Sequence, residues 1–177
     1  ADVITFSGDK VLGGPQSGLL VGSKAWLTQI HKNPIMRAVR CDKLIYAAME
    51  ATLKLYFQNN LLQEHAVLRM MTEPAEHVKN RAQDIVDQLD ADLIKKHNIH
   101  IEQSQAQFGS GALPLEKLDS YAIVFDCNTN SADETAHFLR TGDPAIVTYI
   151  ADDKVWLDIR TIDSSLANSL VRRLNAM

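Results

Sequence analysis

The most constraining feature of this sequence is the change of hydrophobic period that follows residue 97. Before it, apolar residues recur at helical spacing, at Val78, Ala82, Ile85, Leu89 and Leu93. This spacing predicts one long amphipathic helix from Thr72 to about His97. After it, short apolar runs predict strands at 99–101, 121–125, 145–150 and 155–159, and helices at 131–140 and after 164. The resulting order of strand, strand, helix, strand, strand, helix predicts a compact α+β unit with a mostly antiparallel sheet.

Four local signals support these boundaries. Thr72, followed by an acidic first turn, is a candidate cap for the long helix. Ser131 and Glu134 have the spacing of a capping box, which predicts a helix start at that point. Asp152 and Asp153 separate the last two predicted strands and predict a hairpin. Ser164 or Ser165 is expected to cap the last helix.

The part before Thr72 has a different organisation. Two short apolar runs, 3–6 and 18–21, predict adjacent strands joined by a glycine-rich connection. A short helix is predicted at 25–30, and Asp42 is a candidate cap for an amphipathic helix that runs to Leu55. We expect residues 1–71 to be the remnant of a larger domain and residues 72–177 to form a complete small domain.

Composition limits the possible functions. The chain has 18 Lys and Arg against 22 Asp and Glu, a formal charge of −4, which excludes an evenly basic surface for nucleic acid. Two cysteines, Cys41 and Cys127, are too few for a disulfide framework and indicate a reduced, cytoplasmic protein. We expect no membrane span and no metal site, since the six histidines have no ligand spacing. The chain opens without methionine in a strand-like run, so we expect it to be part of a longer protein.

Lys10 is the first candidate for chemistry. It follows a predicted strand and the turn Ser7-Gly8-Asp9, and glycines lie on both sides of it. A lysine amine becomes a covalent catalyst when it condenses with a carbonyl, and the aldehyde of pyridoxal phosphate is a common partner. Ser7 and the backbone at Gly13 and Gly14 could then contact the cofactor phosphate. The alternative is a solvated loop lysine.

Three arginines are further candidates. Arg37 and Arg40 lie three residues apart, and two guanidinium groups can fork onto an oxyanion such as phosphate. Their alternative is a solvated basic face, or ion pairs with Asp42 and Glu50. Arg160 ends a predicted strand and could face a cleft between domains, or it could be a surface arginine paired with Asp158.

The remaining titratable residues have simpler interpretations. We expect four of the histidines to lie at the surface: His31, His65, His77 and His97. Cys41 lies beside the arginine pair, and we interpret it as a passive thiol.

Several motifs, in order, resemble those of the bacterial L-seryl-tRNA(Sec) selenium transferase family. They are Ser7-Gly8-Asp9-Lys10, Leu12-Gly13-Gly14-Pro15-Gln16-x-Gly18, Val21-Gly22, Pro34-x-x-Arg37-Ala38-x-Arg40-x-Asp42-Lys43, Ala48-x-Glu50-Ala51-Thr52-Leu53, Ser104-Gln105, Gly109-x-Gly111-Ala112-Leu113-Pro114 and Leu157-Asp158-x-Arg160-Thr161. Each motif alone is unspecific, but their joint occurrence over almost the whole chain is specific.

This resemblance implies an α/β enzyme of fold-type I that depends on pyridoxal phosphate. Lys10 would bind the cofactor covalently, with Ser7, Gly13 and Gly14 near its phosphate. Arg37 and Arg40 would act in catalysis and, with Arg160, in substrate binding. The implied reaction converts seryl-tRNA(Sec) to selenocysteinyl-tRNA(Sec) with selenophosphate, through an aminoacrylyl intermediate. The implied assembly is a cytoplasmic homo-oligomer, at least a dimer and expected to be a larger ring, and the present chain alone is expected to be inactive.

Two other functions stay open from the residues. One is a related lyase that uses the same cofactor on a free amino acid or amino sugar. The other is a non-catalytic lobe used for oligomerisation or binding, with a vestigial lysine. Binding of pyridoxal phosphate to the intact protein would separate the second from both enzymes.

Overall fold

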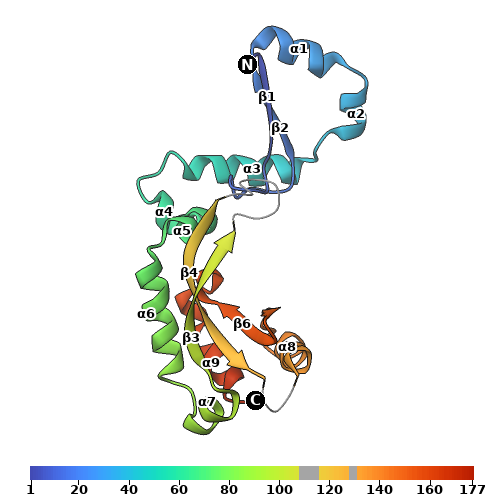
Figure 1. Cartoon of the computed structure of the whole chain (residues 1–177). Coiled ribbons are helices and arrows are strands. Elements are labelled where there is room, and N and C mark those ends of the chain that lie inside the picture. The colour runs from blue at the N-terminus through green and yellow to red at the C-terminus, as the bar shows by residue number, and fades with distance from the viewer. Residues whose placement is uncertain (108–115, 128–130) are drawn as a thin grey trace. The chain divides into compact units, whose positions relative to one another are not determined.

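The computed structural model describes residues 1–107, 116–127 and 131–177 (Figure 1). The chain divides into two compact units, the first formed by residues 1–72 and the second by the described residues from Glu73 onward. The glycine-bearing motif predicted at 109–114 lies outside the described residues. Within the described ranges, no helix is both long and apolar enough to cross a membrane.

The first unit begins with an antiparallel pair of strands. Strand β1 (Val3–Ser7) pairs with β2 (Gly18–Gly22), with Val3 opposite Gly22 and Ser7 opposite Gly18, which confirms the two adjacent strands. The helices that follow are α1 (Lys24–Lys32), α2 (Ile35–Val39), α3 (Lys43–Leu55), α4 (Leu61–Glu64) and α5 (Ala66–Thr72). The Asp42 carboxylate accepts from the Leu44 and Ile45 N–H groups at 2.9 and 3.0 Å, so the predicted cap of α3 is confirmed.

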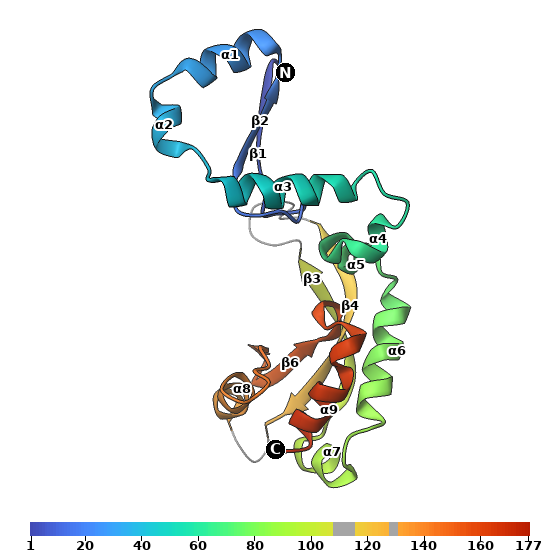
Figure 2. The same ribbon diagram turned by 180° about the vertical axis from the view of Figure 1, so that it is seen from behind.

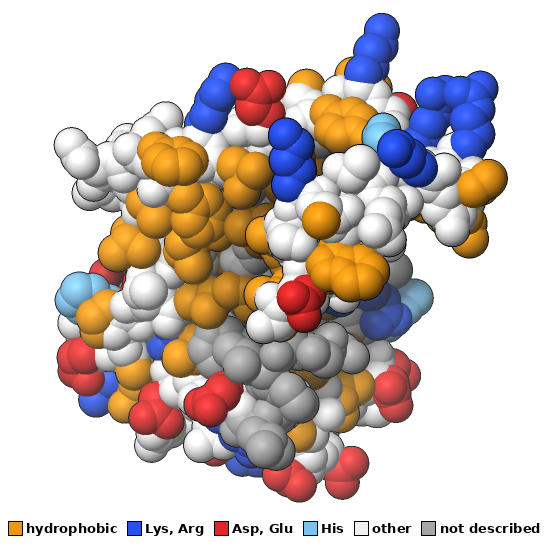
Figure 3. Space-filling model, turned by 90° about the horizontal axis from the view of Figure 1, so that it is seen from above, with side chains coloured by type: hydrophobic (Ala, Val, Ile, Leu, Met, Phe, Trp, Pro, Cys, Tyr) orange, Lys and Arg blue, Asp and Glu red, His pale blue; other side chains and the backbone are white. Residues whose placement is uncertain are grey.

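The first unit buries little of its apolar surface. In residues 1–72, only Gly8, Met49 and His65 are buried. The large apolar side chains that are exposed are Ile4, Phe6, Leu20, Val21, Trp26, Ile35, Val39, Leu44, Tyr46, Leu53, Phe57 and Leu62. Figure 3 shows hydrophobic side chains at the surface beside those of lysine and arginine. An apolar surface of this extent is typical of an interface with further protein.

The second unit is built on one antiparallel sheet. Its helices are α6 (Ala75–Val86), α7 (Ala91–His97), α8 (Ala132–Arg140) and α9 (Ala167–Leu174), and its strands are β3 (His100–Gln107), β4 (Lys117–Asp126), β5 (Tyr149–Ala151) and β6 (Lys154–Asp158). Two 3₁₀ turns, η1 (Ile159–Thr161) and η2 (Ser164–Leu166), precede α9. The spatial strand order is β3-β4-β6-β5, with every neighbouring pair antiparallel. The predicted element order and the mostly antiparallel sheet are therefore confirmed.

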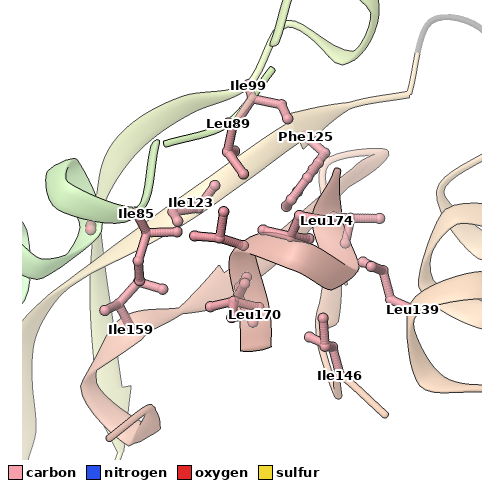
Figure 4. Packing of buried hydrophobic residues seen from close by; sticks show 14 of the residues in the cluster. Ile85, Leu89, Ile99, Ile123, Phe125, Leu139, Ile146, Ile159, Leu170 and Leu174 are labelled. Carbon is pink, nitrogen blue, oxygen red and sulfur yellow. The ribbon is translucent and has the colours of Figure 1, made fainter. Parts of the chain in front are cut away.

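The core of the second unit lies on one face of this sheet. Ile123 is paired with Leu157 and Phe125 with Val155, so these four side chains point to the same face. Helices α6, α8 and α9 supply the facing apolar residues, among them Ile85, Leu139, Leu170 and Leu174 (Figure 4). Figure 2 shows α9 in front of the strands, on the face where this core forms.

The prediction of one long helix from Thr72 to His97 is wrong, because this part of the chain forms separate helices. Thr72 ends α5, Pro74 is the cap residue of α6, and the chain leaves the helix between Val86 and Ala91. Asn175, at the far end of the chain, accepts from the Asp90 N–H at 3.0 Å and donates to the Gln88 carbonyl at 3.3 Å. These bonds satisfy backbone groups that a continuous helix would pair internally.

Other boundaries differ in detail. The predicted strand at 145–150 is reduced to Tyr149–Ala151, and β3 runs on through polar residues to Gln107 because each has a partner on β4. Ser131 and Glu134 form the predicted capping box, with both bonds at 3.1 Å. Asp152 and Asp153 form the predicted hairpin at φ values of 51° and 58°. The serine cap expected for the last helix is wrong, because the cap residue of α9 is Leu166 and makes no side-chain cap bond. Asp163 instead caps the preceding turn η2, where its carboxylate accepts from the Ser165 N–H at 3.0 Å.

Candidate active site

Lys10 lies in the connection between β1 and β2. Its side chain is exposed, and among the residues described it makes no ion pair. The Gly13 N–H donates to the Lys10 carbonyl at 2.9 Å and closes a tight turn over residues 10–13. Lys10 therefore presents an accessible amine on a turn closed by a backbone hydrogen bond, and an amine is the group that condenses with a carbonyl compound.

The connection that carries Lys10 is folded on itself. The Gly8 N–H donates to the Ser17 carbonyl and the Gly14 N–H to the Gly8 carbonyl, both at 2.8 Å. Met49 of α3 packs against this loop, and a Cβ on Gly8 would collide with its terminal methyl group. The N–H groups of Gly13 and Gly14 therefore donate within the loop, and Ser7 is exposed at the end of β1.

His65 also contacts this loop, and no pattern in the sequence predicts that contact. The surface position expected for it is wrong, because the side chain is only 3% exposed and its Nε2 lies 2.9 Å from the Leu12 carbonyl oxygen. The two residues are 53 positions apart, and no local pattern indicates such a contact. His97 is also buried, again contrary to expectation, while His31 and His77 are exposed.

Arg37 and Arg40 are both exposed in the first unit. Arg37 belongs to α2, and Arg40 directly follows the end of that helix. Their alternative partners are engaged elsewhere, since Asp42 caps α3 and Glu50 pairs with Lys54 at 2.7 Å. Within the described residues neither arginine is in an ion pair, so both guanidinium groups are accessible to an external anion.

Positive charge is concentrated around these two arginines. Between Lys24 and Lys43 the chain has five lysines and arginines and one acidic residue, Asp42. A chain with a net charge of −4 thus has a local cationic segment, which favours anions over cations at this surface.

Arg160 belongs to the second unit and is buried. Its guanidinium donates to the backbone carbonyls of Glu73 at 2.8 Å and Asp119 at 2.5 Å. The interpretation as a surface arginine paired with Asp158 is wrong. The Asp158 carboxylate accepts instead from the hydroxyls of Ser104 and Ser120 at 2.7 and 2.8 Å, and from the backbone N–H of Arg160 at 2.9 Å.

A partly buried ion pair lies next to Arg160. Arg81 of α6 binds both carboxylate oxygens of Glu73, at 2.5 and 2.9 Å, and also donates to the Ile159 carbonyl at 3.0 Å. The hydrogen bond from Arg81 lowers the pKa of the Glu73 carboxyl. This pair ties the start of α6 to η1.

The second unit also gathers a titratable cluster from three adjacent strands. Lys154 Nζ lies 3.2 Å from a carboxylate oxygen of Glu102 and of Asp126, and His100 Nε2 lies 2.6 Å from Glu102. Hydrogen bonds to these two carboxylates raise the pKa of Lys154. No group of three or more potential metal ligands is assembled in the described parts of the chain.

Comparison with known proteins identifies the family. The family model for L-seryl-tRNA selenium transferase matches residues 1–163. Curated proteins named L-seryl-tRNA(Sec) selenium transferase are similar to the chain. The one from Alkaliphilus metalliredigens is 43% identical over 162 residues, covering 91% of this chain and 34% of the relative. The one from Carboxydothermus hydrogenoformans is 40% identical over 161 residues, with coverage of 91% and 34%.

A third relative, from Haemophilus influenzae, is 39% identical over 164 residues and is covered to 35% of its length. The chain thus spans about a third of the length of these relatives. With the family model matched over residues 1–163, the chain belongs to the L-seryl-tRNA selenium transferase family.

Proposed function

We propose that this chain provides the cofactor lysine and the anion-binding arginines of an enzyme that converts seryl-tRNA(Sec) to selenocysteinyl-tRNA(Sec). The proposed selenium donor is selenophosphate, and the proposed cofactor is pyridoxal phosphate. In the net reaction the seryl hydroxyl is replaced by selenium, and the phosphoryl group of the donor is released as phosphate. The names of the relatives support the substrate, and the donor and cofactor are our extension.

The observation that carries this proposal is the exposed amine of Lys10 on a loop fixed by backbone hydrogen bonds. Pyridoxal phosphate, when bound, supplies an aldehyde carbon for the amine and a ring that stabilises negative charge at the substrate α-carbon. Lys10 would hold the cofactor and, once released from it, could move the α-proton of the seryl group.

The other proposed contacts follow from the loop. The exposed Ser7 hydroxyl can donate to the cofactor phosphate. Gly13 and Gly14 would let the backbone lie close to the cofactor phosphate, because they have no side chain. Their N–H groups already donate within the loop. This geometry therefore fits a phosphate-bearing aldehyde beside Lys10, with Ser7 as the hydroxyl donor.

Arg37 and Arg40 are proposed to bind selenophosphate. A small dianion is held best by forked, permanently charged donors, and both guanidinium groups are exposed and outside ion pairs among the described residues. We propose Arg160, in the second unit, as a substrate-binding residue. Its guanidinium also donates to the backbone carbonyls of Glu73 and Asp119, as described above.

We further propose that the active form is a cytoplasmic homo-oligomer and that the 177-residue chain alone is inactive. The exposed apolar side chains of the first unit support this proposal, because they require cover from further protein. The coverage of the relatives, about a third, is consistent with the remaining site residues lying in the rest of the full-length protein.

The test is Lys10→Ala in the full-length protein. Wild type should bind pyridoxal phosphate with the visible absorbance of a lysine-linked cofactor, and borohydride reduction should label the peptide that contains Lys10. Lys10→Ala should lose both signals. Lys24→Ala, which removes another exposed lysine of the same unit, should retain them. A reducible linkage at wild-type level in Lys10→Ala would refute the assignment of the lysine, and absence of cofactor from wild type would favour a non-catalytic lobe.

A further inference from the structure

His65 is the cap residue of helix α5 and is held there by its ring. The Leu68 N–H donates to His65 Nδ1 at 3.2 Å, and the Arg69 N–H donates to the His65 carbonyl at 2.9 Å. The imidazole therefore takes the place of the serine or aspartate side chain that usually accepts from the first turn of a helix. Because Nδ1 accepts a hydrogen bond, it is unprotonated.

The other ring nitrogen is then fixed as a donor. A neutral imidazole with unprotonated Nδ1 carries its proton on Nε2. Nε2 lies 2.9 Å from the Leu12 carbonyl oxygen, which can only accept. The Tyr56 hydroxyl donates to the same carbonyl at 3.1 Å, and the two rings meet edge to face with centroids 5.3 Å apart. The carbonyl two residues after Lys10 is thus held by two side-chain donors.

The His65 imidazole also restricts which residue can follow Leu12. Gly13 has a φ of +71°, and a Cβ at this position would overlap the His65 ring. The N–H of this glycine closes the turn onto the Lys10 carbonyl at 2.9 Å. His65 therefore bonds to residue 12 and packs against residue 13, and both belong to the turn that starts at Lys10.

We propose that His65 and Tyr56 are positioning residues for the cofactor lysine. This inference depends on the proposed function, in which Lys10 binds the cofactor. The two side chains, which we call the Leu12 clamp, hold the turn of residues 10–13 so that the Lys10 amine leaves a fixed backbone. Fixing the backbone lowers the conformational entropy lost when a flexible lysine is ordered on a cofactor.

Two substitutions of His65 separate the clamp from the helix cap. In His65→Asn the amide oxygen can replace Nδ1 as acceptor for Leu68, while the donor to Leu12 is lost. In His65→Gln the amide nitrogen can replace Nε2 as donor to Leu12, while the cap is lost. Tyr56→Phe removes the second donor and keeps the ring. Tyr46→Phe is the matched control, since the hydroxyl of this exposed tyrosine of α3 makes no hydrogen bond among the described residues.

The first readout is hydrogen exchange of the Gly13 amide in the cofactor-free, full-length protein. Loss of one clamp bond should accelerate exchange by about two- to tenfold in His65→Asn and Tyr56→Phe. Exchange in His65→Gln and Tyr46→Phe should stay near wild type. Unchanged exchange in both His65→Asn and Tyr56→Phe would overturn the clamp, whatever the role of Lys10.

The second readout is the fraction of Lys10 that borohydride traps with pyridoxal phosphate, compared with thermal stability. The clamp predicts less linkage in His65→Asn and Tyr56→Phe, with His65→Gln near wild type although its cap is lost. Linkage that follows thermal stability across all the variants would overturn the positioning role. Absence of linkage from wild type would instead overturn the proposed function, and with it the role of the clamp in cofactor attachment.

Discussion

The pair of Glu73 and Arg81 offers a prediction whose size follows from its burial. The two side chains are 19% and 18% exposed, and the contact is bidentate. Exposed pairs contribute about 1 kcal/mol or less, whereas removing one partner of a fully buried pair costs about 3–5 kcal/mol. Glu73→Gln keeps the shape and one acceptor but removes the charge. We expect it to lower the free energy of unfolding by about 1–3 kcal/mol at pH 7.

The same pair predicts a dependence on pH. Arg81 lowers the pKa of folded Glu73 below its ordinary value of 4.5. The stabilisation is therefore complete above about pH 4.5 and is lost as the pH falls through the lowered folded pKa. The difference in stability between wild type and Glu73→Gln should be constant from pH 7 to pH 5 and should shrink below that.

The assay is urea unfolding followed by the fluorescence of one tryptophan. The chain has two, and Trp26→Phe leaves Trp156, which lies in β6 and stacks on Tyr149 at 5.9 Å. Unfolding of the second unit is then followed alone in this background. A difference between the two proteins that is below 0.5 kcal/mol, or that stays the same from pH 7 to pH 3, would refute the reasoning.

Two other predictions concern the arginine pair and His97. In the full-length protein, Arg37→Lys or Arg40→Lys keeps the charge but loses the fork, so selenium addition in single turnover should slow by about ten- to a hundredfold while dehydration of the seryl group is retained. Equal loss in both steps would make these arginines structural. Burial lowers the pKa of His97 from its ordinary value of 6.5, so the chain should lose stability as the pH falls below about 6.5. His97→Leu should lose less stability than wild type between pH 7.5 and 5.5 in urea unfolding, and equal losses would exclude His97 as the cause.

Local signals in the sequence determined much of the fold. Asp42 caps α3, Ser131 and Glu134 form the capping box, and the two aspartates after β5 form the hairpin, all as predicted. Each of these signals acts between residues no more than about four apart, so the sequence contains the whole interaction. The motif around Lys10 and the arginine pair likewise indicated the family, because it is a pattern of residue types along the chain.

Tertiary structure decided the features that join distant segments. Asn175 bonds to the segment between α6 and α7 from 85 residues away, at the point where the sequence predicts one continuous helix. Arg160 reaches the carbonyl of Glu73 across 87 residues and is buried instead of exposed. His65 reaches Leu12 across 53 residues. The spacing of apolar residues determines which face of a helix or strand is buried. The hydrogen-bond partner of a buried polar side chain is instead a distant backbone group, and only the packed fold brings the two within hydrogen-bonding distance.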